Sequence, residues 1–229
     1  MIQDLYIKGV AAASGGGVNS TLVMKTNQTT SYRTGDDGDF EYGRMTDFDT
    51  LALPNPFGTM ARFTDTLGTQ VYANDIVLDW SNTDGTEVLG YYRIATTGTW
   101  NDAIDNSLAL SVGTFTSGWR LPNIKELLNI AKYEGTVDDK GLNYTPFNLT
   151  YGTFVWSSTT NPATTANAMA FTNNTSVTSE SILKTQSYPR IVPVRSFTYT
   201  ELGVTSTDPV TGAKLLKTGL ITSYRTGDD

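Results

Sequence analysis

Apolar residues recur at helical spacing in one stretch of the chain, residues 100–110. Side chains that repeat at i, i+3 and i+4 line one face of a helix and can be buried together. Thr99 stands at the N-cap position, and Asp102 follows three residues later, which is the spacing of a capping box. The pattern predicts an amphipathic helix. Its apolar face comprises Trp100, Ala103, Ile104 and Leu108.

A second, better-specified helix is predicted over residues 123–132. Asn123 can cap its first turn. Glu126 occupies the third helical position, where its carboxylate can accept from the backbone of the cap. The apolar stripe comprises Ile124, Leu127, Leu128 and Ala131.

Strands are favoured elsewhere, since threonine fills 38 positions and glycine 21. Branching at Cβ suits the pleat of a strand, and glycine with asparagine and aspartate supplies tight turns. Short alternating or apolar stretches predict strands at residues 153–157, 168–172 and 191–197. The expected fold class is α+β, with two helices, short antiparallel strands and long polar loops.

The chain is expected to have three parts. Residues 1–22 comprise a short strand at residues 4–10 and a linker rich in Gly, Ser and Ala at residues 11–20. Residues 23–197 are long enough to bury one core and form the main domain. Residues 198–229 form a C-terminal extension.

The extension repeats the segment that opens the domain. Residues 25–37 return as residues 217–229, an offset of 217 − 25 = 192 residues, with ten of thirteen positions identical. A match of this density is a true internal repeat. We expect the second copy either to begin another domain or to pack on a neighbouring chain, and both arrangements give head-to-tail contacts.

The net charge is −7, from 16 basic and 23 acidic residues, and the basic residues form no run that could follow a phosphate backbone. We therefore expect no nucleic acid partner. No apolar stretch approaches the roughly 20 residues of a membrane span, so no membrane insertion is expected. The N-terminus lacks the pattern of a secretory signal. We expect either export by another route, as for a phage structural protein, or a fragment of a longer chain.

The chain has no histidine and no cysteine. This excludes Ser-His and Cys-His nucleophiles, structural zinc sites, thiol redox chemistry and disulfides. A glycoside hydrolase needs two carboxylates about 5 to 9.5 Å apart, and the 23 acidic residues single out no such pair. We expect no enzymatic activity, and no cofactor unless calcium binds.

The acidic run Asp36, Asp37 and Asp39 is the candidate calcium site, because hard cations bind several carboxylate oxygens within one turn. It departs from an EF-hand, since counting from Asp37 places Tyr42 where glycine is needed and Phe48 where the bidentate glutamate is needed. The alternative is a Gly-Asp turn whose carboxylates accept from backbone amides. A second group has the same two interpretations: Asp79, Asn82, Asp84 and Glu87.

Amide and hydroxyl side chains gather between positions 159 and 176 and form the candidate ligand site. These groups exchange hydrogen bonds with sugar hydroxyls without the desolvation of full charges. The alternative is a solvated loop, because loops are polar whether or not they bind. The candidate ligand-binding residues are Asn161, Thr164, Asn167, Asn173 and Asn174.

A set of motifs follows one order along residues 25–197. The most specific are GWRLPNIKEL at residues 118–127 and VWSSTT at residues 155–160, with TTSYRTGDDGD at residues 29–39 before them and VPVR at residues 192–195 after them. In order and spacing these motifs resemble the family of the C-terminal domain of the Legionella collagen-like adhesin.

This resemblance implies a C-type-lectin-like fold, related in shape to formylglycine-generating enzymes and phage tropism proteins and used mostly for surface binding. In the sulfatase-activating relatives catalysis depends on cysteines and copper, and this chain has no cysteine. The resemblance also places the candidate ligand site on the long-loop face of such a fold.

Aromatic residues in the motifs are expected in the core, because a tryptophan buries a large apolar area. Arg120 and Arg195 are expected to fix the second helix against the strands by pairing with carboxylates such as Glu126. The expected core residues are Trp80, Trp119, Leu121 and Trp156.

The expected function is that of a non-enzymatic, surface-exposed, lectin-like protein, adhesive or receptor-binding, in a repeated or multimeric assembly. Its expected partners are a cell-surface glycan or protein receptor and neighbouring copies of itself. Its expected location is extracellular, on a bacterial surface or in a phage virion. The alternative is a structural subunit of an extracellular filament or virion with no ligand of its own, and a carbohydrate-active enzyme is a third interpretation.

Overall fold

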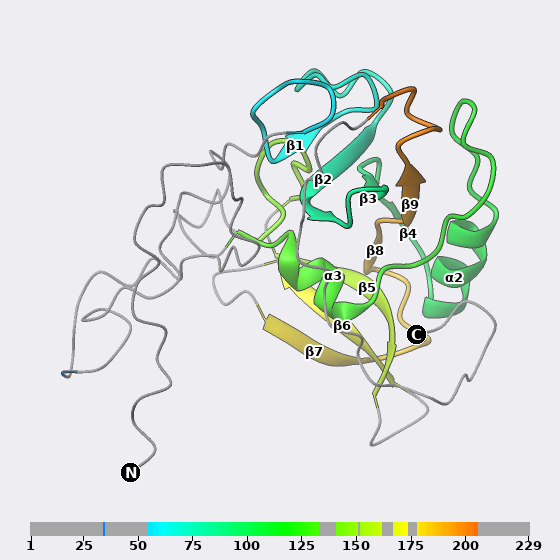
Figure 1. The fold of residues 1–229 in the computed structure, drawn as a ribbon. Coiled ribbons are helices and arrows are strands. Elements are labelled where there is room, and N and C mark those ends of the chain that lie inside the picture. Colours follow the sequence, from blue (N-terminus) through cyan, green and yellow to red (C-terminus); the bar gives the residue numbers. More distant parts are fainter. Residues whose placement is uncertain are drawn as a thin grey trace, which may run out of the picture.

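The computed structural model describes residue 34 and residues 55–132, 141–150, 152–161, 167–173 and 178–205. These residues form two sheets and two helices (Figure 1). The helices are α2 (Trp100–Leu108) and α3 (Ile124–Asn129). The strands are β1 (Phe63–Thr64), β2 (Ile76–Thr83), β3 (Glu87–Tyr92), β4 (Thr96–Thr97), β5 (Thr153–Thr160), β6 (Asn167–Asn173), β7 (Thr178–Leu183), β8 (Arg190–Ile191) and β9 (Val194–Thr198).

The strands form an antiparallel sheet in the order β1-β2-β3-β9 and a mixed sheet in the order β4-β8-β5-β6-β7. In the mixed sheet β5 and β8 run parallel, and the other neighbours run antiparallel. Strands predicted at residues 153–157 and 168–172 are confirmed within β5 and β6, which are both longer. Mostly antiparallel strands with two helices confirm the expected α+β class.

The strand predicted over residues 191–197 is wrong as a single element. Ile191 ends β8 and pairs with β4 in the mixed sheet, whereas Val194 opens β9 and pairs with β3 in the antiparallel sheet. Pro193 between them has no N–H to donate to a ladder. The chain leaves one sheet and enters the other at this proline.

Both predicted capping boxes are present. Thr99 Oγ1 accepts from the N–H of Asp102 at 3.2 Å, and the Asp102 carboxylate accepts from the N–H of Thr99 at 2.9 Å. Asn123 and Glu126 make the same reciprocal pair at the start of α3, at 2.9 and 2.8 Å. Local sequence therefore specifies where each helix begins.

Helix α3 ends earlier than predicted. The N–H of Lys132 donates to the carbonyl of Gly141 at 2.8 Å, and the Gly141 N–H donates back to Lys132 at 2.8 Å. This bridge takes the backbone of Lys132 out of the helical ladder, so the helix closes at Asn129. The helix predicted near residues 123–132 is thus confirmed, and it ends at Asn129 because a partner beyond the helix competes for the backbone.

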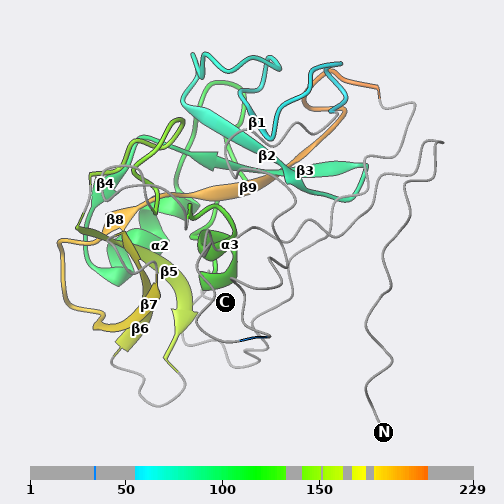
Figure 2. The same cartoon turned by 90° about the vertical axis from the view of Figure 1, so that its left-hand side faces the viewer.

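Helix α3 lies between the two sheets (Figure 2). Its Leu127 is fully buried in one cluster with Val77 of β2 and Val155 of β5. Helix α2 packs Trp100 and Ile104 against the other face of the mixed sheet. None of the described helices is long and apolar enough to cross a membrane. The expected core residues are all buried: Trp80, Trp119, Leu121 and Trp156.

A buried ion pair joins the antiparallel sheet to the C-terminal end of α3. Arg62 donates through Nε to Asp79 Oδ1 at 3.0 Å and through Nη2 to Oδ2 at 3.2 Å, and both side chains are fully buried. Arg62 Nη2 also donates to the carbonyl of Asn129 at 2.9 Å, and the Asn129 amide donates to Asp79 at 3.1 Å. Because Asn129 ends α3, these bonds fix that end of the helix on β2.

The predicted pairing of Arg120 with Glu126 is confirmed. The two terminal nitrogens of Arg120 donate to the two oxygens of Glu126 at 2.8 and 2.5 Å, and Glu126 is buried. The backbone of Arg120 also exchanges hydrogen bonds with Val194 of β9, at 2.9 and 2.8 Å. The first turn of α3 is thus held on β9, whereas Arg195 pairs with Glu201 instead, at 2.6 Å.

Replacing Asp79 with asparagine should destabilise the domain by about 3 to 5 kcal/mol, because the guanidinium of Arg62 would stay buried without its counter-charge. Urea denaturation followed by tryptophan fluorescence gives the free energy of unfolding. Asp75→Asn is the matched control, since Asp75 also pairs with an arginine, at 2.9 Å, but is 37% exposed. The Asp75→Asn variant should lose about 0 to 1 kcal/mol of its free energy of unfolding. Equal losses in the two variants would show that the buried pair does not hold α3.

Candidate functional site

Two of the predicted ligand-binding residues meet where β5 ends and β6 begins. The backbone N–H of Asn161 donates to the carbonyl of Asn167 at 3.2 Å. The side-chain Nδ2 atoms of both residues donate to the hydroxyl oxygen of Ser181 on β7, at 2.6 Å from Asn161 and 2.9 Å from Asn167. We call Asn161, Asn167 and Ser181 the polar rim.

A hollow of about 350 Å³ lies beside the polar rim and shares Ser181 with it. The rings of Phe154 and Tyr188 meet edge to face there, with centroids 5.7 Å apart, and Tyr188 is 52% exposed. The hollow therefore joins an accessible aromatic surface to polar side chains. Its lining consists of Phe154, Glu180, Ser181, Ile182, Leu183, Gln186 and Tyr188.

The described lining of the hollow contains the carboxylate of Glu180 and no basic side chain. Lys184 follows β7, but its ammonium lies 3.8 Å from the ring centroid of Trp100 and donates to Thr160 at 3.4 Å. A cation over an aromatic face is attracted by the ring quadrupole. The charge of Lys184 is thus directed toward α2, and the hollow offers an anionic ligand no cation from its own lining.

Sequence patterns did not identify Ser181 or Tyr188. Ser181 lies 20 residues from Asn161 along the chain and reaches it only through the β6–β7 register, in which Met169 is opposite Ser181. Tyr188 precedes Pro189, and a residue before proline favours extended backbone. The sequence therefore contained a signal for the backbone conformation at Tyr188. The amides were predictable from composition, whereas their common partner depends on strand pairing.

Among the other predicted ligand-binding residues, the structure describes Asn173 and does not bring it to the polar rim. Asn173 ends β6 opposite Thr153, at the far end of the strand from Asn167. Thr164 and Asn174 lie outside the described residues. The same holds for the candidate calcium ligands Asp36, Asp37 and Asp39.

Two carboxylates of the second acidic group have structural roles. Asp79 is engaged by the buried pair with Arg62. Asp84 Oδ1 accepts from the N–H groups of Thr86 and Glu87 at 3.0 and 2.9 Å, which confirms the turn interpretation at the β2–β3 connection. Among the residues that the structure describes, no group of three or more acidic, histidine or cysteine side chains is placed to hold a metal ion.

Comparison with known proteins identifies one family. The family model described as the Lcl C-terminal domain matches residues 69–195. That span contains both helices and the polar rim, and the match confirms the resemblance to the adhesin domain over these residues. Searches of curated proteins and of solved structures return no match.

Proposed function

The chain belongs to the Lcl C-terminal domain family, and we propose from this membership and from the polar rim that it is a non-enzymatic adhesive module on a cell surface. Its ligands are neutral glycans, and its fold is of the C-type-lectin-like kind. The family supports an adhesin-like role at a surface. The site chemistry supports the choice of ligand.

One observation carries the proposal: two carboxamides converge on one hydroxyl beside an aromatic hollow. Ser181 accepts from both amides, at 2.6 and 2.9 Å, and keeps its own hydrogen for an acceptor on a ligand. Because the three groups hold one another, less side-chain entropy is lost when a ligand binds. Amides and hydroxyls complement the mixed donors and acceptors of a sugar.

The hollow supplies the apolar half of sugar recognition. One face of a sugar ring carries mainly C–H groups, and an exposed aromatic ring such as Tyr188 offers a flat apolar surface for it. The carboxylate of Glu180 can accept from sugar hydroxyls. With this carboxylate in the lining and a net charge of −7, sulfated or sialylated glycans are disfavoured.

Replacing Asn161, Asn167 and Ser181 together with alanine should weaken binding to neutral glycans about 10- to 100-fold, since each lost hydrogen bond contributes about 0.5 to 1.5 kcal/mol. A glycan array carrying neutral, sialylated and sulfated chains identifies the ligand, and calorimetry with that ligand measures the loss. Ser179→Ala is the matched control, because Ser179 is exposed on the same strand and takes no part in the rim. Both variants should keep a nearly unchanged melting temperature.

Unchanged glycan binding in the triple variant would show that the polar rim is not the site. Preferential binding to sulfated or sialylated chains would contradict the choice of neutral ligands. Turnover of a bound glycan would contradict the non-enzymatic role and favour a carbohydrate-active enzyme.

A structural subunit of an extracellular assembly is the second candidate function, and the internal repeat favours it. The two copies, residues 25–37 and 217–229, lie outside the described residues apart from residue 34. Among the described strands β7 lies at the edge of the mixed sheet, and the side chains of its first four residues are exposed. Edge strands can accept a further strand from another chain. The repeat and this edge together support head-to-tail contact between copies.

Deleting residues 218–229 should then leave a folded protein that no longer assembles. Sedimentation velocity over a range of concentrations measures the oligomeric state of the full chain and of the deletion variant. The structural role is wrong if the variant assembles as the full chain does, or if the full chain is a monomer at every concentration. The adhesive role would then be the remaining proposal.

A further inference from the structure

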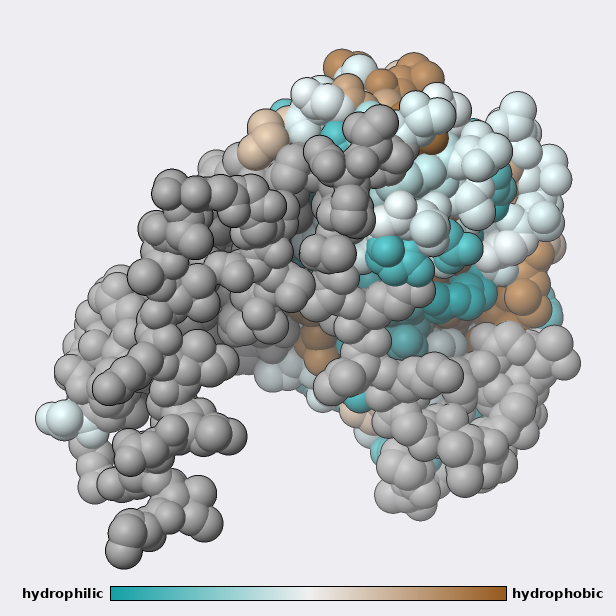
Figure 3. Space-filling view, viewed as in Figure 1, coloured by the Kyte–Doolittle hydropathy of each residue, from teal (hydrophilic) through white to brown (hydrophobic). Residues whose placement is uncertain are grey.

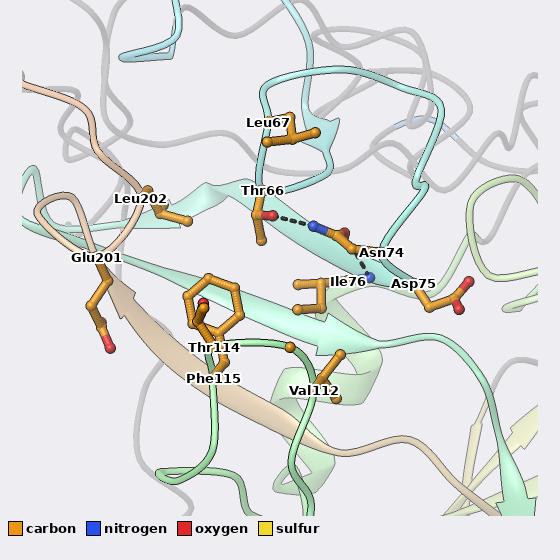
Figure 4. A pocket seen from close by; sticks show the side chains of 11 residues that line it. Thr66, Leu67, Asn74, Asp75, Ile76, Val112, Thr114, Phe115, Glu201 and Leu202 are labelled. Atoms are coloured by element: carbon orange, nitrogen blue, oxygen red, sulfur yellow. Dashed lines mark hydrogen bonds between the residues drawn. The ribbon is translucent and has the colours of Figure 1, made fainter.

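The hollow beside the polar rim contains a carboxylate without a partner in the part of the chain that the structure describes. Glu180 lines this hollow and makes no ion pair or hydrogen bond there through its side chain. A larger groove of about 480 Å³ on the antiparallel-sheet side differs in this respect (Figure 4). Its Asp75 is paired with Arg93 at 2.9 Å. Its Glu201 is paired with Arg195 at 2.6 Å. The hollow therefore has a negative charge available for a ligand.

Two aromatic rings form a corner in the same hollow. The rings of Phe154 and Tyr188 have centroids 5.7 Å apart and planes at 66° to each other. In the described part of the chain, no arginine or lysine lies over either ring. The face of an aromatic ring is electrostatically negative and attracts cations. The hollow thus offers a cation two rings and a carboxylate.

Strand register places the carboxylate and one of the rings on the same face of the mixed sheet. Glu180 on β7 lies opposite Ala170 on β6. Phe154 on β5 lies opposite Thr172, two residues further along β6. Cross-strand partners, and residues two apart on one strand, direct their side chains to the same face. β5 and β7 flank β6, so their backbones lie about 10 Å apart. Between them Ala170 presents a single methyl group, which leaves room for a compact ligand.

The chain fills the same combination of groups with its own arginine elsewhere. The guanidinium of Arg195 lies 4.6 Å from the ring centroid of Phe197 and 5.3 Å from that of Phe115. These two rings also meet edge to face, with centroids 4.9 Å apart. Arg195 donates to Glu201 at 2.6 Å. Two rings and a carboxylate therefore hold a cation in this protein, and the described lining of the hollow has the same three groups without one.

The charge of the hollow distinguishes it from the apolar surface at the end of the molecule that carries β1. Figure 3 shows that apolar surface, and Met60, Leu67 and Val71 are exposed on the turns around β1. Leu183 and Tyr188 also expose apolar area in the hollow, but beside a carboxylate. A lining that is both apolar and anionic favours a ligand that is both apolar and cationic.

A quaternary ammonium group meets these requirements better than a primary one. A primary ammonium has three N–H donors that need acceptors, and Glu180 is the one anion in the described lining. A quaternary ammonium has no N–H, and its charge is spread over methyl groups that can contact ring faces. Aromatic sites recognise such groups by the attraction between the cation and the rings.

We propose that the hollow binds a choline-type quaternary ammonium group, with its methyl groups on Phe154 and Tyr188 and its charge facing Glu180. Gln186 in the lining supplies an amide for the choline hydroxyl. The inference goes beyond glycan binding and does not rest on it, because it needs none of the amides of the polar rim. A bound choline group covers Tyr188 and so competes with a sugar for that ring.

Titration of the nitrogen-15-labelled full chain with choline chloride at constant ionic strength tests the proposal. The backbone amide signals of Glu180, Ile182 and Tyr188 report on the hollow. The matched ligand is the neutral alcohol in which a carbon atom replaces the choline nitrogen. Choline should bind at least about tenfold tighter than this alcohol, since only choline gains the attraction to the rings and the carboxylate. Methylammonium should bind more weakly than choline.

Glu180→Gln should weaken choline binding at least about fivefold and leave binding of the neutral alcohol unchanged, because only a charge is lost. Glu87→Gln is the matched control, since it makes the same change on β3, outside the hollow. Tyr188→Leu should also weaken choline binding at least about fivefold. Tyr188→Phe keeps the ring and should restore choline binding.

Equal binding of choline and the neutral alcohol would overturn the proposal, and tighter binding of methylammonium would overturn the choice of a quaternary group. Equal losses in Glu180→Gln and Glu87→Gln would show that net charge, and not the hollow, attracts the cation. The double variant Asn161→Ala with Asn167→Ala should bind choline as the parent chain does, so a failure of the polar rim remains distinguishable from a failure here. Far-UV circular dichroism of each variant separates these outcomes from unfolding.

Discussion

The short helix α3 depends on two arginine–carboxylate pairs that tie its ends to the antiparallel sheet. A helix of six residues has no stability of its own, because the cost of nucleation outweighs so few hydrogen bonds. Arg120 holds Glu126 in its first turn, and the Arg62–Asp79 pair holds Asn129 at its last residue. Between these anchors the fully buried Leu127 fills the space between the sheets. The packing of one sheet against the other therefore depends on the two arginine–carboxylate pairs that fix this helix.

The same helix connects the core to the polar rim. The N–H of Ser158 donates to the carbonyl of Pro122 at 2.8 Å, and the N–H of Ile124 donates to Thr159 Oγ1 at 3.1 Å. The two most specific segments, GWRLPNIKEL and VWSSTT, are thus bonded to each other where α3 begins. β5 ends at Thr160, so Asn161 follows directly from this anchored stretch. The two motifs that build the packed core therefore also position the side-chain amide of Asn161 in the polar rim.

Local chemistry was predictable from the sequence, and long-range pairing was not. Both capping boxes and the Arg120–Glu126 pair join residues within six positions of one another, so spacing alone indicated them. Asp79 is one of 23 acidic residues, and only the fold identifies Arg62 as its partner. Ser181 likewise meets Asn161 through strand register. Composition therefore indicated a polar surface but could not specify which polar groups converge.

The most direct test of the adhesive role is an NMR titration of nitrogen-15-labelled protein with a neutral oligosaccharide. The side-chain amide signals of Asn161 and Asn167 report on the polar rim, and the amide of Asn129, bonded to Asp79, reports on the core. The account predicts that both rim signals shift together in a saturable way while the Asn129 signal stays in place. Rim signals that do not move when other regions of the protein respond to the sugar would contradict it.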